Sequence, residues 1–171
     1  MKTFVFIVTL FITVSNGFAQ NTVSMQERID QAMQMVQQPT PEAFLESIAT
    51  LKGISEEYPD SIAPREYLAI QSMVFALVAP TAPQTEALLS SSKEMLATLE
   101  ALPQMDKSDL YTMQGMYYMA VIVQNPVENG PRYYMQVTEL YDKALKLNPD
   151  NALAKQMQSE FYKGMNRYLK G

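Results

Sequence analysis

The sequence predicts an all-α protein built as a stack of helical hairpins, and two observations support that prediction. Six prolines fall into two interleaved series, each with a spacing of about 45 residues, and repeats of that length are typical of solenoids. The series are Pro59, Pro103 and Pro149, and Pro39, Pro80 and Pro126. The segments between these prolines have helical apolar periodicity and are rich in residues that favour helix.

The first two helices are predicted from signals at their amino-terminal ends. A helix over 25–38 is expected because Ser24 and Glu27 have the spacing of a capping box. A second helix over 41–58 is expected after Thr40, a capping residue followed by a proline at the first helical position. Both helices therefore begin at defined residues.

The next three helices are delimited by prolines. We expect them over 63–78, 83–102 and 107–124, with Asp106 or Ser108 as the cap of the last. Each ends one to two residues before a proline, which cannot continue a helix without losing a hydrogen bond.

The last two helices are predicted around a loop. The segment 125–131 contains two prolines, two asparagines and a glycine, so it is expected to be a connection. A sixth helix then follows over 131–147 and a seventh over 151–169, which is expected to cover the open end of the stack.

Residues 1–19 have the pattern of a cleavable secretory signal peptide. Lys2 precedes an apolar run over 3–14, and small residues stand before Gln20 at the expected cleavage site. The run is shorter than the roughly 20 residues that span a bilayer. We therefore expect one domain over 20–171 that is periplasmic or secreted and not a lipoprotein, since Gln20 stands where a lipoprotein has cysteine.

Composition excludes several classes of function. The chain has no histidine and no cysteine, so a Ser-His-Asp or Cys-His site is impossible and a zinc site is not expected. A net charge of −5 disfavours binding to nucleic acids and to anionic membranes. No phosphate-binding loop or dinucleotide fingerprint occurs. We expect no enzyme activity, no cofactor, no metal and no integral membrane association.

The segment 141–150, with Val137 before it, resembles the second helix of a tetratricopeptide repeat. Val137, Tyr141, Ala144 and Pro149 have the spacing that this family gives to small or apolar residues and to a closing proline. The resemblance implies a right-handed α-solenoid of about three hairpins with a C-terminal capping helix. The chain is also similar to small exported repeat proteins of Bacteroidota-type bacteria, which carry an Asn-Pro…Asn-Gly segment inside a hairpin.

The repeat departs from the family in its length. The period is about 45 residues where the family has about 34, and the chain lacks the family's tryptophan. Small residues nevertheless recur at Ala69, Gly115 and Ser159, where the resemblance implies a close approach of two helices.

The resemblance also implies a ligand-binding concave face. Five methionines, a tyrosine and an isoleucine would line it, and flexible thioethers suit varied apolar partners. These residues are Tyr67, Ile70, Met73, Met113, Met116, Met119 and Met157. The alternative is that the methionines fill the core.

Two further groups of residues are candidates for binding or chemistry. Tyr117-Tyr118 and Tyr133-Tyr134 flank the expected loop, and in each pair one ring is expected to pack and the other to reach the surface for a sugar or peptide; a purely structural role is the alternative. Paired acids such as Asp106 and Asp109 suit glycoside hydrolysis or simply lie on a solvated surface.

The function expected from these observations is an exported adaptor that binds a peptide or protein segment without catalysis. Two alternatives stay open. One is a carboxylate-dependent glycan hydrolase, which needs two acids that converge in a pocket. The other is an envelope component that self-associates into a homo-oligomer.

Overall fold

The computed structural model describes residues 23–170, and this part of the chain is helical with no strand. The predicted signal peptide lies outside the described residues. The helices are α1 (Met25–Met35), α2 (Pro41–Glu57), α3 (Ala63–Val78), α4 (Thr85–Glu100), α5 (Lys107–Gln124), α6 (Pro126–Leu147) and α7 (Ala152–Lys170). None of these helices is both long and apolar enough to cross a membrane.

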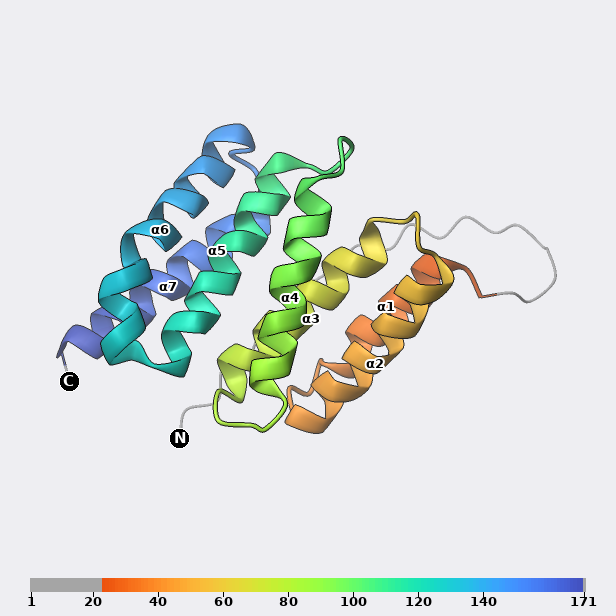
Figure 1. Ribbon diagram of the computed structural model, residues 1–171, viewed down its shortest axis with the longest axis horizontal. Coiled ribbons are helices and arrows are strands. Elements are labelled where there is room, and N and C mark those ends of the chain that lie inside the picture. The colour runs from red at the N-terminus through yellow and green to blue at the C-terminus, as the bar shows by residue number, and fades with distance from the viewer. Residues whose placement is uncertain (1–22, 171) are drawn as a thin grey trace.

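Neighbours in sequence are neighbours in space. Each helix packs against the next one, and α3 also contacts α5, which in turn contacts α7. Figure 1 shows α1 and α2 at one end of the molecule and α6 and α7 at the other. The connections α2–α3, α4–α5 and α6–α7 lie along one edge, and the other three connections lie along the opposite edge. The molecule is therefore an all-helical array of antiparallel neighbours.

The predicted helix starts are confirmed at three caps. Ser24 and Glu27 form both hydrogen bonds of the capping box at α1. The hydroxyl of Thr40 accepts from the backbone N–H of Ala43 at α2, 3.2 Å away. Asp106, rather than Ser108, caps α5.

The loop predicted over 125–131 is wrong, because α6 begins at Pro126 and only Asn125 separates it from α5. The side chain of Asn125 caps α6 by accepting from the backbone N–H of Glu128 at 3.3 Å, and its amide donates to the Glu128 carboxylate at 3.1 Å. Asn129 then donates to the carbonyl of Val121 near the end of α5, 2.8 Å away. Polar side chains thus satisfy both helix ends within one tight corner.

Pro131 lies inside α6 instead of opening it. A proline there removes one backbone hydrogen bond and disfavours helical geometry at the preceding residue, mainly through the Cβ of that residue. The preceding residue is Gly130, which has no Cβ, so much of that steric conflict is absent. The Asn-Pro…Asn-Gly segment is therefore a helix start and not a connection.

Two large groups of apolar side chains form the core. One group joins α1, α2 and α3, and the other joins α3, α4, α5, α6 and α7. α3 contributes to both groups. It therefore links the two halves of the core, which are continuous along the array.

Of the three small residues predicted to allow a close approach of two helices, two are buried and one is exposed. Ala69 and Gly115 are buried, whereas Ser159 on α7 is exposed because no described helix covers that side of it. At Gly115 the fit is tight: a Cβ would lie 2.8 Å from Cε1 of the fully buried Tyr141 on α6. The absence of a side chain at Gly115 therefore lets α5 and α6 approach.

Candidate functional site

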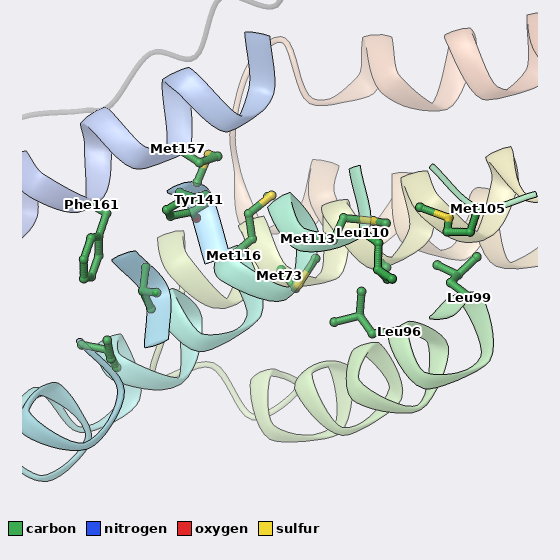
Figure 2. Close-up of a cluster of buried hydrophobic side chains, with 13 residues drawn as sticks. Met73, Leu96, Leu99, Met105, Leu110, Met113, Met116, Tyr141, Met157 and Phe161 are labelled. Atoms are coloured by element: carbon green, nitrogen blue, oxygen red, sulfur yellow. The ribbon is translucent and has the colours of Figure 1, made fainter. Parts of the chain in front are cut away.

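Four of the five methionines predicted to line a concave face lie in the core. Met73, Met113, Met116 and Met157 are at most 2% exposed. Figure 2 shows them among buried leucines and the rings of Tyr141 and Phe161. The expectation of an open methionine-lined groove is not met at these four positions, because their helices pack closely enough to cover them. Their placement agrees with the alternative that they fill the core.

The other three predicted residues are half-buried. Tyr67 and Ile70 lie on α3 and Met119 lies on α5. The Met119 sulfur accepts a long contact of 3.9 Å from the Tyr141 hydroxyl, so it also serves packing. Tyr67 and Ile70, both on α3, are the predicted residues that still reach the surface.

The four tyrosines around the α5–α6 corner pack on other aromatic rings. Tyr118 contacts Tyr117 edge-on, with ring centroids 5.2 Å apart, and contacts Tyr133 at 5.1 Å. Tyr134 contacts Phe161 on α7 at 5.4 Å. All four tyrosines are half-buried, so the expectation of one packed and one exposed ring in each pair is wrong. Their main role is to join α5, α6 and α7 through ring contacts.

The most distinctive polar feature is a group of carboxylates from two helices. Glu66 lies in the first turn of α3, next to Tyr67, and Asp106 and Asp109 lie at the start of α5. We call these four residues the acidic patch. Its three carboxylates form no ion pair with any lysine or arginine of residues 23–170. The patch therefore holds three carboxylates without an ion-pair partner among the described residues.

Two carboxylates of the patch, those of Glu66 and Asp109, have a pKa above the usual value. Burial raises the pKa of Glu66, and the charges of Asp109 and Asp106 raise it further. Burial and the charge of Asp106 likewise raise the pKa of Asp109, against a lowering by its hydrogen bond from Asn151. Burial followed by the charges of Asp30, Glu66 and Asp109 raises the pKa of Tyr67. Acids on other helices therefore contribute, after burial, to the raised pKa of Glu66 and of Tyr67.

A buried hydrogen-bond network fixes Asp109. The amide of Asn151, which precedes α7, donates to Asp109 Oδ1 at 2.9 Å and to Ser108 Oγ at 2.9 Å. Ser108 in turn donates to the carbonyl of Ala144 near the end of α6, 2.9 Å away. Three helices thus meet at the base of the patch and hold one of its carboxylates in place.

The patch lies outside the two hollows found in the described chain. One hollow is on α7, beside Glu160 and Lys163, and the other is at the α1–α2 turn, around Met35 and Thr40. Both hollows are shallow and open to solvent. Within residues 23–170 no cluster of acidic residues has the arrangement of a metal site. The geometry suits recognition of a cationic group at the surface.

Sequence reasoning named three of the four residues of this patch, Tyr67, Asp106 and Asp109, but not as one group. The spacing of Asp106 and Asp109 marked them as a pair, but nothing in the sequence joined them to Glu66, about 40 residues away. The available signal was the repeat itself, since a period of about 45 residues places the starts of α3 and α5 side by side. However, Glu66 and the two aspartates are 40 and 43 residues apart, so they do not occupy equivalent positions of the repeat and a search by period alone would have missed Glu66.

Replacing Glu66 by glutamine is expected to stabilise the protein at neutral pH by about 0.5 kcal/mol, a size typical of partly solvated charges. The raised pKa of Glu66 means that the native state binds a proton more tightly than the unfolded chain. The free energy of unfolding therefore falls as the pH rises through the native pKa of Glu66. The stability lost in this way is fully regained below the pKa of glutamate in the unfolded chain, about 4.3. Urea unfolding at pH 7 and near pH 4 measures the difference.

The advantage of Glu66→Gln should shrink as the pH is lowered. Glu46→Gln, at an exposed glutamate of α2, is the matched control and should change stability little at either pH. If the gain in unfolding free energy from Glu66→Gln stayed constant with pH, the charges of the patch would not act on Glu66.

No family model, no curated protein and no solved structure matches this chain.

Proposed function

We propose that this chain is an exported, non-catalytic adaptor that binds a lysine- or arginine-bearing segment of another protein through the acidic patch. In this proposal the seven helices form a right-handed, tetratricopeptide-like solenoid of three hairpins closed by α7. The alternation of connections between two edges supports the hairpin stack (Figure 1). The patch then occupies the starts of α3 and α5, the first helices of the second and third hairpins.

The observation that carries the proposal is that three carboxylates without an ion-pair partner, on the neighbouring helices α3 and α5, lie beside a half-buried tyrosine. Burial, and then repulsion from neighbouring acids, raises the pKa of Glu66 and of Asp109, and at neutral pH this costs stability unless a cation binds. A lysine or arginine side chain would remove that repulsion, and the ring of Tyr67 would pack against its aliphatic stem. Electrostatic complementarity of this kind gives specificity and fast association.

The test compares two triple variants of equal net charge. Glu66→Gln/Asp106→Asn/Asp109→Asn neutralises the patch and keeps the shape of each side chain, and asparagine retains the cap of α5. The control carries glutamine at three exposed glutamates on other helices, which are Glu46, Glu94 and Glu139. The probe is a fluorescent decapeptide of alternating lysine and glycine, measured by anisotropy at two salt concentrations.

Wild type and control are expected to bind the probe alike, and the patch variant should bind about tenfold more weakly, which is about 1.4 kcal/mol. The difference in affinity between wild type and the patch variant should be smaller in high salt, because salt screens exposed charges. Equal weakening in both variants would mean that only net charge matters and would refute the patch as the binding surface.

A glycan hydrolase is the second candidate, because acids with a raised pKa are typical of general acid catalysis. Against it, neither of the two hollows described above contains Glu66 or Asp109, and catalytic sites need a concave region that holds the substrate. Release of reducing sugar from peptidoglycan or plant glycans by wild type, abolished in Glu66→Gln, would favour the hydrolase over the adaptor.

A further inference from the structure

Met135 differs from the other methionines of the described chain. It lies on the outer side of α6 and is 63% exposed, whereas every other methionine of residues 23–170 is buried or half-buried. It follows Val127 and Pro131 at a spacing of four residues, so the three exposed side chains form an apolar stripe along one face of α6. The Val127 side chain is 76% exposed.

Several of the other thioethers are protected, in one of two ways. Met73, Met113, Met116 and Met157 are enclosed by the core, so an oxidant reaches them only after local opening. Among the half-buried methionines, the sulfur of Met33 accepts a contact from the Gln71 amide at 3.1 Å, and that of Met119 accepts one from the Tyr141 hydroxyl at 3.9 Å. These contacts engage the sulfur lone pairs that would attack an oxidant.

We propose that Met135 is a modification site, at which hydrogen peroxide converts the thioether to the sulfoxide while the protein stays folded. The sulfur attacks one peroxide oxygen, an S–O bond forms as the O–O bond breaks, and the second oxygen leaves as water after proton transfer. The sulfur loses two electrons and the peroxide gains them. Because the chain has no cysteine, thioethers are its only sulfur groups that an oxidant can attack.

The modification changes the surface and spares the core. A sulfoxide is polar, so oxidation places a polar group at one end of the apolar stripe on α6. The exposed side chain makes few packing contacts that this change could disrupt. The oxidised protein is therefore expected to keep its melting temperature and to elute earlier from a hydrophobic-interaction column.

The test is a time course of the folded protein in hydrogen peroxide, quenched with free methionine and analysed by peptide mass spectrometry. Met135 should oxidise at least about tenfold faster than Met73, Met113, Met116 and Met157, since each 1.4 kcal/mol of opening free energy slows a buried site tenfold. In urea all methionines should react at similar rates.

Met135→Leu is the matched variant, since it removes the sulfur and keeps an apolar side chain of similar size on α6. After peroxide treatment this variant should not elute earlier from the hydrophobic-interaction column. Oxidation of any buried methionine as fast as Met135 in the folded protein, a half-buried methionine that reacts first, or a fall in melting temperature on single oxidation of Met135 would each overturn the proposal.

Discussion

Replacing Tyr141 by alanine is expected to lower the free energy of unfolding by about 4 kcal/mol, because large-to-small changes at buried aromatic residues cost about 3–5 kcal/mol. Tyr141 is fully buried in the larger part of the core and lies against the backbone of α5 at Gly115. Figure 2 shows its ring beside Met116 and Met157. Alanine would leave a cavity that these rigidly packed helices cannot close.

Urea or thermal unfolding followed by circular dichroism measures this loss. Tyr141→Phe is the control: it keeps the ring and removes only a hydroxyl whose contact with the Met119 sulfur is a weak 3.9 Å. It should therefore cost less than about 1 kcal/mol, the usual value of one hydrogen bond. A similar loss in both variants would mean that the ring is not what stabilises the α5–α6 contact.

A double-mutant cycle separates the contact from helix propensity. Gly115→Ala should destabilise the wild type by about 1–2 kcal/mol, since overpacking outweighs the gain of about 1 kcal/mol from alanine in a helix. In the Tyr141→Ala background the same change should be neutral or stabilising. Gly53→Ala is the matched control, because nothing lies within 4 Å of the added Cβ, and it should stabilise the protein. Additive effects at Gly115 and Tyr141 would contradict the close approach.

Replacing Asn151 by alanine is expected to lower the free energy of unfolding by about 2–3 kcal/mol. The change removes the side chain that accepts from the backbone N–H of Ala154 at the start of α7, and such caps contribute about 1 kcal/mol. It also leaves the buried Ser108 hydroxyl without its donor, which adds a desolvation cost of about 1–3 kcal/mol. Chemical denaturation monitored at far-ultraviolet wavelengths tests the sum.

Two neighbouring variants divide this effect into its parts. Asn151→Ser keeps a capping oxygen but cannot reach Ser108 and Asp109, so it should recover about 1 kcal/mol. Asn148→Ala changes an exposed asparagine in the same corner, whose side chain accepts only from the N–H of Asp150, and should cost less than about 1 kcal/mol. Equal losses at Asn148 and Asn151 would show that the buried network adds nothing to the stability of the corner.

Local signals in the sequence predicted most of the helix ends. Ser24, Thr40 and Asp106 are caps whose oxygen bonds a backbone N–H three residues later, and such contacts depend on no other part of the chain. The same local reasoning failed at Asn125–Pro131. There Pro131 lies inside α6, after Gly130, whose lack of a Cβ removes part of the steric conflict that a proline creates.

The sequence by itself determined that the protein is helical and where its helices begin, since these properties depend on residues within a few positions of one another. Tertiary structure alone decided that Met73, Met113, Met116 and Met157 are enclosed and that Met135 is not, because burial depends on which neighbouring helix covers a side chain. It also decided that Glu66 is partly buried and lies near enough to Asp109 for that charge to raise its pKa. Charges on different helices interact only when packing brings those helices together.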